Sequence, residues 1–453
     1  MLPLFKSGCH THPGNYRPIT LLPAINKVYE KLLFNRLIKF FEKYNLISDN
    51  QYGFRPKHST ELAITKFYDN VVISLNNNQT CAAILLDLSK AFDSVNRSIL
   101  LYKLHAYGIR GPPYKLLESY LSNRTQYIHT NSIKSDQYPS SCGVPQGSTI
   151  SPLLFLIMIN DLKHSTQLNV LNFADDTLLY KELPNINNTE LYLNKEFRKV
   201  NEWMDKNHLK LNLSKTNYLI FAHNHNKSTN IKLSTNNNQQ IEQVSNCKYL
   251  GMIIDTKLNW KLHVEKIIHK LAKAIGIMYR VRNFLNKKSL KLIFHSLILS
   301  RINYGILNYG RASNTTLKPL TVLMNRALRC INFIGRRDKR TSLIYFDEKI
   351  LQFQDILKLE LGKFCYKFVK NLLPKSLNQT FINVSKIHSY DTRNSSNRFF
   401  RKKQIKSFGY TSINYLGSKL WNDIPKEIKN SNTIHRFTKK YKFNLLQKYQ
   451  NAI

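Results

Sequence analysis

Residues 168–180 read Leu-Asn-Val-Leu-Asn-Phe-Ala-Asp-Asp-Thr-Leu-Leu-Tyr, so two adjacent carboxylates, Asp175 and Asp176, separate two apolar runs. Two apolar runs around a short polar pair predict a β-hairpin with a tight turn at the acidic pair. Aspartate tolerates the backbone angles of such a turn because its short side chain can bond locally. Two like charges at a hairpin tip repel each other, and a bound divalent cation would offset that repulsion. The segment therefore predicts a hairpin with a metal site at its tip, although an Asp-Asp pair alone is weak evidence for metal.

A third carboxylate, Asp87, directly follows the apolar run 81–86, which predicts a buried strand. A carboxylate at the end of such a strand lies at the rim of the sheet, where ligands bind in α/β proteins. If the hairpin pairs beside this strand, Asp87 converges on Asp175 and Asp176. Two Mg²⁺ ions about 4 Å apart, or Mn²⁺ in their place, would then neutralise the three charges. Taken alone, Asp87 is also compatible with a helix N-cap, and for the nearby Asp93 we expect the N-cap role.

The charge of the chain indicates a polyanionic partner. The 453 residues include 68 Lys and Arg against 28 Asp and Glu, a formal net charge of +40. Nucleic acid is the expected partner, rather than an anionic membrane, because the longest apolar run, 152–159, is too short to span a bilayer. The chain opens without a secretory signal segment, so we expect an intracellular protein, nuclear or cytoplasmic. The six cysteines are dispersed and show neither zinc-ligand spacing nor a disulfide framework.

The pattern of apolar residues predicts an α/β (α+β) first half and a helical second half. A helix is predicted over 26–41 and another from Ser151, with short strands over 217–254 joined by an Asn-rich loop at 223–240. Helical periodicity then recurs at 261–285, 289–308, 316–334 and 351–373. The basic stretch from Pro374 predicts either a loosely ordered tail or, around Trp421, a segment that packs. These changes predict three regions, 1–254, 255–373 and 374–453.

Three segments then occur in a diagnostic order: Asp87-Leu-Ser-Lys-Ala-Phe-Asp, Gly143-Val-Pro-Gln-Gly-Ser and Phe173-Ala-Asp-Asp. In this order and spacing the chain resembles reverse transcriptases, and among them those of non-LTR (LINE-type, jockey-like) retrotransposons. Further agreement lies in Asn15-Tyr-Arg-Pro-Ile, Gln51-Tyr-Gly-Phe-Arg, Asn212-Leu-Ser-Lys-Thr, Lys248-Tyr-Leu-Gly and Gly417-Ser-Lys-Leu-Trp-Asn-Asp-Ile-Pro. The resemblance covers nearly the whole chain.

The resemblance implies a right-hand polymerase architecture, with fingers and palm in 1–254, a helical thumb-like region in 255–373 and a basic C-terminal region in 374–453. It implies an RNA-directed DNA polymerase, a nucleotidyltransferase that extends a primer 3′-OH with dNTPs by two-metal phosphoryl transfer. The expected partners are an RNA template, a DNA primer, their RNA–DNA hybrid and dNTPs. Asp87, Asp175 and Asp176 match the family's catalytic metal ligands.

The resemblance also implies roles for five nucleotide-binding residues. Phe92 matches the bulky residue under the incoming sugar, where a ring would clash with a ribose 2′-OH; an ordinary core Phe is the alternative. Gln146 and Gly147 match the loop that shapes the nucleotide pocket, with a plain turn as the alternative. Arg55 matches a fingers residue that neutralises triphosphate charge, or is simply a surface arginine. Lys215 matches a lysine suited to the leaving pyrophosphate, although exposed lysines are abundant in this chain.

Full-length relatives usually carry an upstream endonuclease domain, whereas this sequence opens inside the matched region. We therefore expect a chain without that domain. The alternative function is a catalytically inactive nucleic-acid-binding remnant of a decayed element. A group II intron maturase would share the fold and the charge, but the Leu-Ser-Lys-Ala-Phe-Asp context and the C-terminal segment argue against it.

Overall fold

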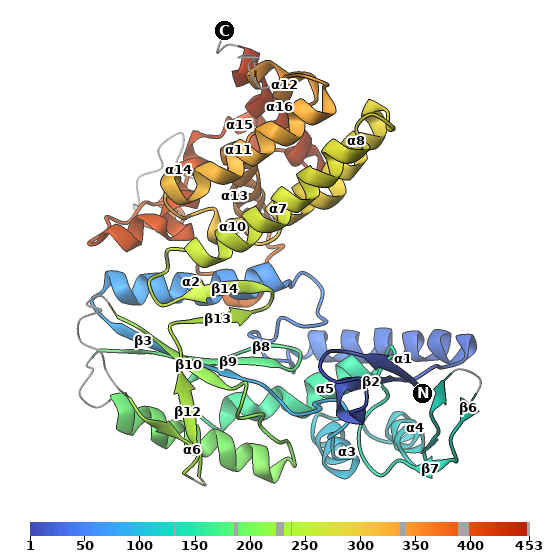
Figure 1. The fold of residues 1–453 in the computed structure, drawn as a ribbon. Helices are drawn as coiled ribbons and strands as arrows, with labels where there is room; N and C mark the ends of the chain where they lie inside the picture. Colours follow the sequence, from blue (N-terminus) through green and yellow to red (C-terminus); the bar gives the residue numbers. More distant parts are fainter. Residues whose placement is uncertain are drawn as a thin grey trace. The chain divides into compact units, whose positions relative to one another are not determined.

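The computed structural model describes residues 1–130, 133–184, 189–222, 231–236, 238–335, 341–387 and 398–450. The chain divides into two compact units (Figure 1). The first comprises Met1–His58, Ala82–Leu219 and Asn226–Val244, and the second comprises Ser59–Cys81, Ile220–His225 and Ser245–Ile453. These units do not coincide with the boundaries predicted at residues 254 and 373. Each unit combines segments that are distant in sequence. A prediction that cuts the chain into consecutive regions cannot describe such units.

A six-stranded sheet forms the centre of the first unit, with strand order β11-β12-β10-β3-β9-β8. The hairpin predicted over 168–180 is its antiparallel pair β8–β9. The predicted strand 81–86 is β3, which lies beside β9. The strand bounds are β3 (Thr80–Leu86), β8 (Asn169–Phe173), β9 (Asp176–Leu183), β10 (Asn217–Phe221), β11 (Leu233–Ser234) and β12 (Gln240–Gln243). Within the predicted Asn-rich loop at 223–240, residues 223–230 and 237 lie outside the described residues, and strand β11 forms in the described part.

Among its described residues, the first unit also contains five longer helices and three short strand pairs outside this sheet, β1–β2, β4–β7 and β5–β6. The helices are α1 (Ala24–Lys43), α3 (Arg97–Ala106), α4 (Pro112–Leu121), α5 (Ser151–Ile159) and α6 (Thr189–Lys206). The short strands include β1 (Leu2–Phe5), β2 (Tyr16–Ile19), β4 (Thr125–Gln126), β5 (His129–Thr130), β6 (Ile133–Lys134) and β7 (Tyr138–Pro139). The predicted fold class, a mixture of helices and sheet, is confirmed.

Two of these helices show how far the apolar pattern predicts burial. Helix α5 is apolar on all sides and nearly all of its residues are buried, as expected for a helix inside a core. Helix α1 confirms the helix predicted over 26–41, but apart from Glu30 its buried residues all lie in its second half. Val28 and Leu32, which belong to the predicted apolar face, are 63% and 58% exposed.

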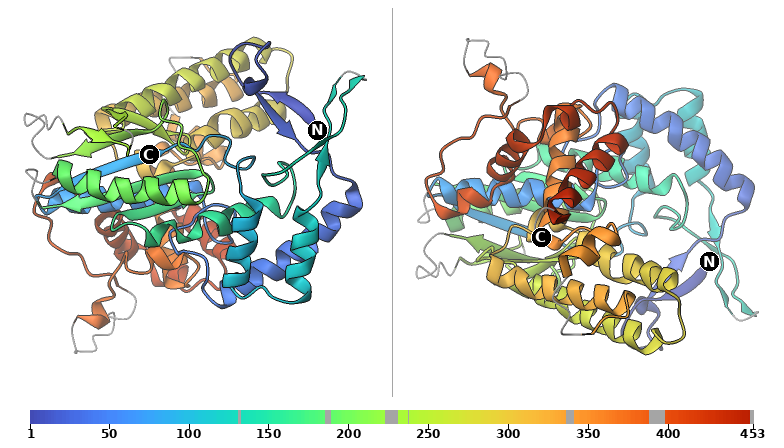
Figure 2. Two further views of the ribbon diagram at one scale, coloured as in Figure 1. Left: turned by 90° about the horizontal axis from the view of Figure 1, so that it is seen from below. Right: turned by 90° about the horizontal axis from the view of Figure 1, so that it is seen from above.

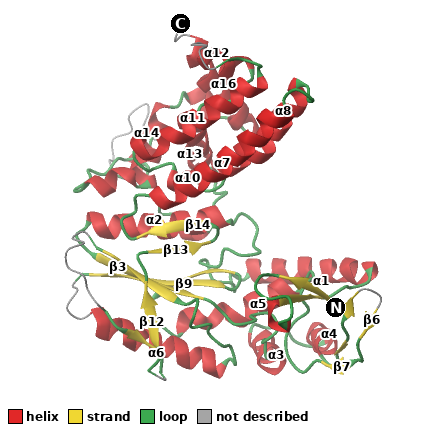
Figure 3. Cartoon of the chain, viewed as in Figure 1, coloured by secondary structure: helices red, strands yellow, loops and turns green. Residues whose placement is uncertain are grey.

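The second unit is helical apart from the hairpin β13–β14 and a short part of the sheet strands (Figure 3). Its elements are α2 (Thr60–Asn76), β13 (Asn246–Tyr249), β14 (Met252–Asp255), α7 (Lys261–Val281), α8 (Lys287–Ile293), the π-helical segment Phe294–Leu299, α9 (Ser300–Asn303), α10 (Ile306–Tyr309), α11 (Asn314–Ile331), α12 (Thr341–Asp347), α13 (Phe353–Val369), α14 (Ile413–Asp423), α15 (Lys426–Lys429) and α16 (Ile434–Gln450). Helices α7 and α11 lie side by side (Figure 2). The predicted helix 289–308 is broken into α8, the π-helical segment, α9 and α10.

The basic C-terminal region packs against the preceding helices. Helices α14 and α16 both contact α13. Trp421 is buried, and the rings of Phe381 and Phe399 stack with centroids 4.4 Å apart. The packed alternative is therefore confirmed for the described part of this region. Helix α16 was not predicted, although Phe437, Tyr441, Leu445 and Tyr449 recur at helical spacing and are buried.

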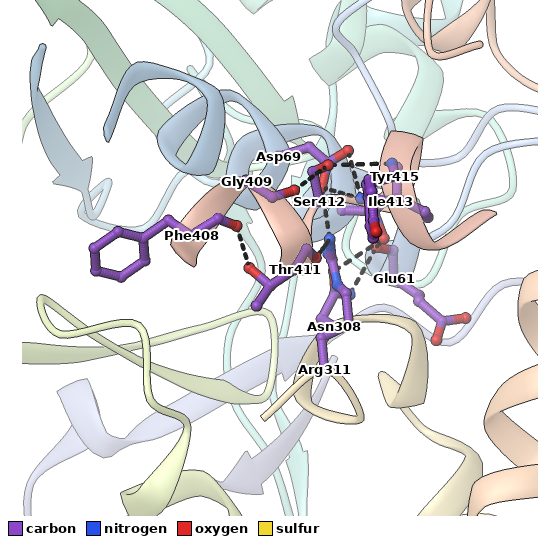
Figure 4. A network of polar contacts seen from close by, with 11 residues as sticks. Glu61, Asp69, Asn308, Arg311, Phe408, Gly409, Thr411, Ser412, Ile413 and Tyr415 are labelled. Atoms are coloured by element: carbon purple, nitrogen blue, oxygen red, sulfur yellow. Dashed lines mark hydrogen bonds and ion pairs between the residues drawn. The ribbon is translucent and has the colours of Figure 1, made fainter. Parts of the chain in front are cut away.

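A buried ion pair links three elements of the second unit (Figure 4). Asp69 of α2 accepts a hydrogen bond from Arg311 Nη1 at 2.5 Å and another from the Ile413 amide at 3.0 Å, at the start of α14. Arg311 also donates to the Asn308 side chain in α10 and to the Thr411 carbonyl. The pair thus joins α2, α10 and α14, with the Asp69 carboxylate and both terminal nitrogens of the Arg311 guanidinium hydrogen-bonded.

None of the described helices is both long enough and apolar enough to cross a membrane.

Candidate active site

The acidic hairpin ends in a two-residue turn made by Ala174 and Asp175. Phe173 pairs with Asp176, so Asp176 is the first residue of β9 rather than part of the turn. Ala174 has a φ of 57°, a left-handed conformation that costs a non-glycine residue free energy. Tight hairpin turns with a positive φ at the first central residue usually carry glycine there. The sequence predicted the hairpin correctly but placed its turn one residue too far along the chain.

Asp87 leaves the end of β3 next to this hairpin, as predicted. Its backbone is held by the segment that follows α6: the Asn212 amide donates to the Asp87 carbonyl at 2.7 Å. The Asp87 amide in turn donates to Thr216 Oγ1 at 3.3 Å. Asp87 and Asp175 line one cavity of about 970 Å³ in the first unit. Its other residues with charged, polar or aromatic side chains include Lys6, Arg17, Lys90, Phe92, Asp93, Gln146 and Lys215.

The charge of Asp175 is set by its surroundings. Burial raises the pKa of its carboxyl group, and the negative charge of Asp87 raises it further. The positive charges of Arg17 and Lys6 oppose both effects. The carboxylates of Asp87 and Asp175 are therefore close enough to interact electrostatically, and the cavity that they line also contains positively charged side chains. This is the electrostatic environment in which a bound cation favours the ionised form of both acids.

The loop from Gly143 to Gln146 contributes Gln146 to the lining of the cavity and closely approaches the turn that contains Phe92 and Asp93. Gly143 has a φ of +81°, and a Cβ on it would lie 2.7 Å from the Asp93 carbonyl oxygen, so this approach requires glycine. The Val144 amide donates to the Phe92 carbonyl at 2.9 Å. The side-chain amide of Gln146 donates to both Asp93 carboxylate oxygens, at 2.8 and 2.9 Å.

Residues 6–254 of the chain match the family model described as reverse transcriptase (RNA-dependent DNA polymerase). The chain belongs to the reverse transcriptase family. This explains why the hairpin, Asp87 and the glycine loop occur in one unit of the fold. The division implied for this family, with fingers and palm in 1–254 and a thumb in 255–373, stays a prediction.

Curated relatives come from mobile elements. The RNA-directed DNA polymerase from mobile element jockey of Drosophila melanogaster is 27% identical over 335 residues, 71% of this chain and 36% of that protein. The probable RNA-directed DNA polymerase from transposon X-element of the same species is 27% identical over 333 residues, 70% of this chain and 36% of that protein. The predicted relation to jockey-like, non-LTR elements is confirmed. The chain spans about a third of the length of these relatives.

Solved structures of other polymerases align more weakly. Apo telomerase from Candida tropicalis aligns over 78% of this chain and 60% of that chain, at 12% identity and a TM-score of 0.40. The RNA-dependent RNA polymerase of a human picorbirnavirus aligns over 71% of this chain and 58% of that chain, at 16% identity and a TM-score of 0.34. At these sequence identities and TM-scores, the alignments give no information about the residues of the site.

The family's use of divalent metal ions fits part of the predicted acidic site. No group of three or more His, Cys, Asp or Glu side chains among the described residues is arranged to hold a metal ion. Asp176 is exposed and does not contribute to the described lining of the cavity. Among the described residues, the three predicted carboxylates therefore do not form a preformed metal-binding group, and the role of Asp176 as a ligand stays a prediction. Asp87 and Asp175 remain, and Mg²⁺ is commonly held by one or two carboxylates together with substrate phosphates.

Asp93 is not the N-cap that the sequence predicted. Asn96 caps α3, its side chain accepting from the Ile99 amide at 3.1 Å, whereas Asp93 binds Gln146. Burial raises the pKa of Asp93, and the Gln146 hydrogen bonds lower it. Gln146 therefore reaches the cavity with its amide already oriented. Gly147, with a φ of +103°, lies instead against the Thr20 carbonyl and does not contribute to the described lining.

The remaining predicted nucleotide-binding residues divide into two that line the cavity and one that does not. Phe92 lines it and also stacks on Phe155 of α5, with ring centroids 5.0 Å apart, and its contact with the sugar stays a prediction. Lys215 is exposed and lines it. Arg55 does not: its side chain is 5% exposed and its Nε lies 2.8 Å from Glu42 Oε1. Its guanidinium also donates to the Ser48 carbonyl, so Arg55 is neither a surface arginine nor a free cation.

Three basic residues near the cavity were not predicted. Arg17 lies in the quoted segment Asn15-Tyr-Arg-Pro-Ile, which could have indicated it, and Lys6 reaches the same cavity from the strand pair β1–β2. Arg97, at the start of α3, donates from Nε to the Gly143 carbonyl at 2.9 Å and from Nη2 to the Cys142 carbonyl at 2.9 Å. It also binds the Ser140 carbonyl and hydroxyl. No local sequence signal indicated that Arg97 organises the glycine loop.

Proposed function

We propose that this chain is the RNA-directed DNA polymerase of a non-LTR retrotransposon, which extends a primer 3′-OH with dNTPs on an RNA template. The observation that carries the proposal is that Asp87 and Asp175 line one cavity with basic residues on the opposing segments. Carboxylates for a metal ion and cations for a triphosphate are the two requirements of nucleotidyl transfer. The family membership of the chain supports the same reaction.

Asp87 and Asp175 would hold the divalent cation, which when bound activates the attacking hydroxyl and stabilises the leaving pyrophosphate. We infer two ions, Mg²⁺ or Mn²⁺, with Asp176 as a further ligand if the turn adjusts. Lys6 and Arg17 take the role first assigned to Arg55, binding the triphosphate through charge-assisted hydrogen bonds.

Other residues of the cavity would select and orient the nucleotide. The Phe92 ring, supported by Phe155, would lie beneath the sugar and exclude a 2′-OH. Gln146, oriented by Asp93, would contact the dNTP, with Gly147 allowing its loop to approach Thr20. Lys215, which lines the cavity, would bind the leaving pyrophosphate or give it a proton. A net charge of +40 supports binding of the RNA template, the DNA primer and their hybrid.

Primer extension on an RNA template tests this function. We expect Mg²⁺-dependent incorporation of dNTPs by the wild-type chain, and none by Asp175→Asn, because the amide cannot supply a carboxylate ligand. Asp205→Asn is the matched control, since Asp205 is exposed near the end of α6 and does not contribute to the described lining of the cavity.

A folded wild-type chain that binds template–primer but incorporates no nucleotide would contradict the proposal. That outcome would instead identify an inactive nucleic-acid-binding remnant. The remnant is the weaker candidate because the cavity combines both carboxylates with the basic residues that a triphosphate needs.

A further inference from the structure

The segment that precedes α2 lies directly against the acidic hairpin. Asn172 of β8 donates its amide to the Asn50 carbonyl at 3.0 Å, and its carbonyl accepts from the Tyr52 amide at 2.7 Å. These bonds form an isolated parallel bridge between Gln51 and Asn172. The segment Gln51-Tyr-Gly is therefore fixed in register beside the end of the strand that leads to Asp175.

The side chain of Gln51 reaches past this bridge to the turn itself. Gln51 is 3% exposed, and its Oε1 accepts from the Gly53 amide at 2.8 Å and from the Ala174 amide at 3.2 Å. Ala174 is the residue held in the left-handed conformation, and it immediately precedes Asp175. The buried Gln51 Oε1 thus accepts a hydrogen bond from the Ala174 amide, a backbone donor of the strained turn. Without that acceptor the turn would lose a hydrogen bond that offsets its strain.

Gly53 completes the contact from the other side. A Cβ on Gly53 would lie 2.4 Å from the Ala174 amide nitrogen and 3.1 Å from the Phe173 carbonyl carbon. Both neighbours are backbone atoms, so they can move away only if the turn moves. The absence of a side chain at position 53 is therefore a condition for the observed position of the turn.

We propose that Gln51 and Gly53 are positioning residues that hold the Ala174–Asp175 turn so that the Asp175 carboxylate faces Asp87. This inference rests on the proposed function, because the position of Asp175 matters only if it binds the catalytic cation. Gln51 and Gly53 do not contribute to the described lining of the cavity, so they act through the turn rather than on the substrate. Partners that orient a metal ligand typically change metal affinity or activity by about 10–100-fold when they are removed.

The test compares Gln51→Met with the wild type, since Met has a similar length but no amide oxygen. We expect the Mg²⁺ concentration for half-maximal primer extension to rise by about tenfold or more, with a matching fall in kcat. The dissociation constant for template–primer, measured in EDTA, is expected to stay unchanged. Gln167→Met is the control, because Gln167 is exposed just before β8 and should leave all three quantities as they are.

Gly53→Ala provides a second variant that keeps Gln51 intact. It should raise the Mg²⁺ requirement in the same direction, because the added Cβ displaces Ala174. Melting temperatures of each variant, taken with and without template–primer, establish that the folded protein is being assayed.

An unchanged Mg²⁺ requirement in both folded variants would overturn the inference. So would a loss of activity that excess Mg²⁺ does not restore and that follows the fall in melting temperature alone. An inactive wild-type chain would instead remove the proposed function. The two failures are thus distinguished by the wild-type control.

Discussion

At the scale of single residues, several side chains act in the site by holding other parts of the chain. Arg97 provides the largest such contribution, because its planar guanidinium binds three carbonyl groups and a hydroxyl of residues 140–143 at once. Asp93 similarly orients Gln146. Lysine has the same charge but presents it at one point, so it cannot replace this set of bonds.

Arg97→Lys is therefore expected to loosen the glycine loop while leaving the carboxylates in place. Hydrogen bonds to a charged group contribute about 1.5–3 kcal/mol each, so losing one or two should raise the KM for dNTPs by about tenfold or more. The effect on kcat at saturating dNTP should be smaller. Steady-state primer extension measures both, and Arg110→Lys, at an exposed position just after α3, serves as control. Equal falls in kcat and kcat/KM would contradict this role.

At the scale of elements, local patterns predicted which segments are helices and strands better than they predicted contacts between them. Helix α2 was not among the predicted helices, and its packing partner could not be derived from its position in the chain. It follows Gln51-Tyr-Gly-Phe-Arg in the chain but packs with α10 in the second unit. There Glu61 is largely buried and accepts from the Leu307 amide at 3.3 Å. Burial raises the pKa of Glu61 to about 7, with only partial compensation from that hydrogen bond.

This shift predicts a pH-dependent stability. Between pH 4.5, the ordinary value, and about 7, the folded state binds more protons than the unfolded state. The free energy of unfolding should therefore fall as the pH rises through this window. At about 1.36 kcal/mol per pKa unit, the loss attributable to Glu61 is at most ~3 kcal/mol.

Glu61→Gln should remove this loss, because glutamine keeps an acceptor oxygen but stays neutral. We expect the variant to be more stable than the wild type at pH 8 and similar to it at pH 4. Urea denaturation monitored by circular dichroism at both pH values measures the difference. Glu265→Gln, at an exposed position of α7, is the control. Parallel pH profiles for wild type and Glu61→Gln would contradict the assignment.

At the scale of the whole molecule, charge dominates. The formal net charge is +40. In the described ion pairs, most acidic side chains contact a single lysine or arginine, so these pairs neutralise only a small part of the positive charge. If nucleic acid is the partner, as proposed, release of its counterions would therefore supply much of the binding free energy.

Binding of an RNA–DNA hybrid should consequently weaken steeply with salt. With six to ten phosphate contacts, the association constant should fall by roughly 10³–10⁵ between 50 and 200 mM salt. Fluorescence anisotropy with the Asp175→Asn variant measures this without turnover. A dissociation constant that does not change with salt would show that the positive charge is not used for nucleic acid.

Local periodicity and short ordered segments were enough to predict the hairpin, the strand that precedes Asp87, the family, and the helices α1, α5, α7, α11 and α13. Tertiary structure decided which of these residues meet. It paired Arg55 with Glu42 and Asp93 with Gln146, moved Asp176 out of the turn, and placed Gln51 against Ala174. The physical reason is that each of these contacts joins residues far apart in the chain or depends on backbone angles. Neither can be derived from the spacing of residue types along the sequence.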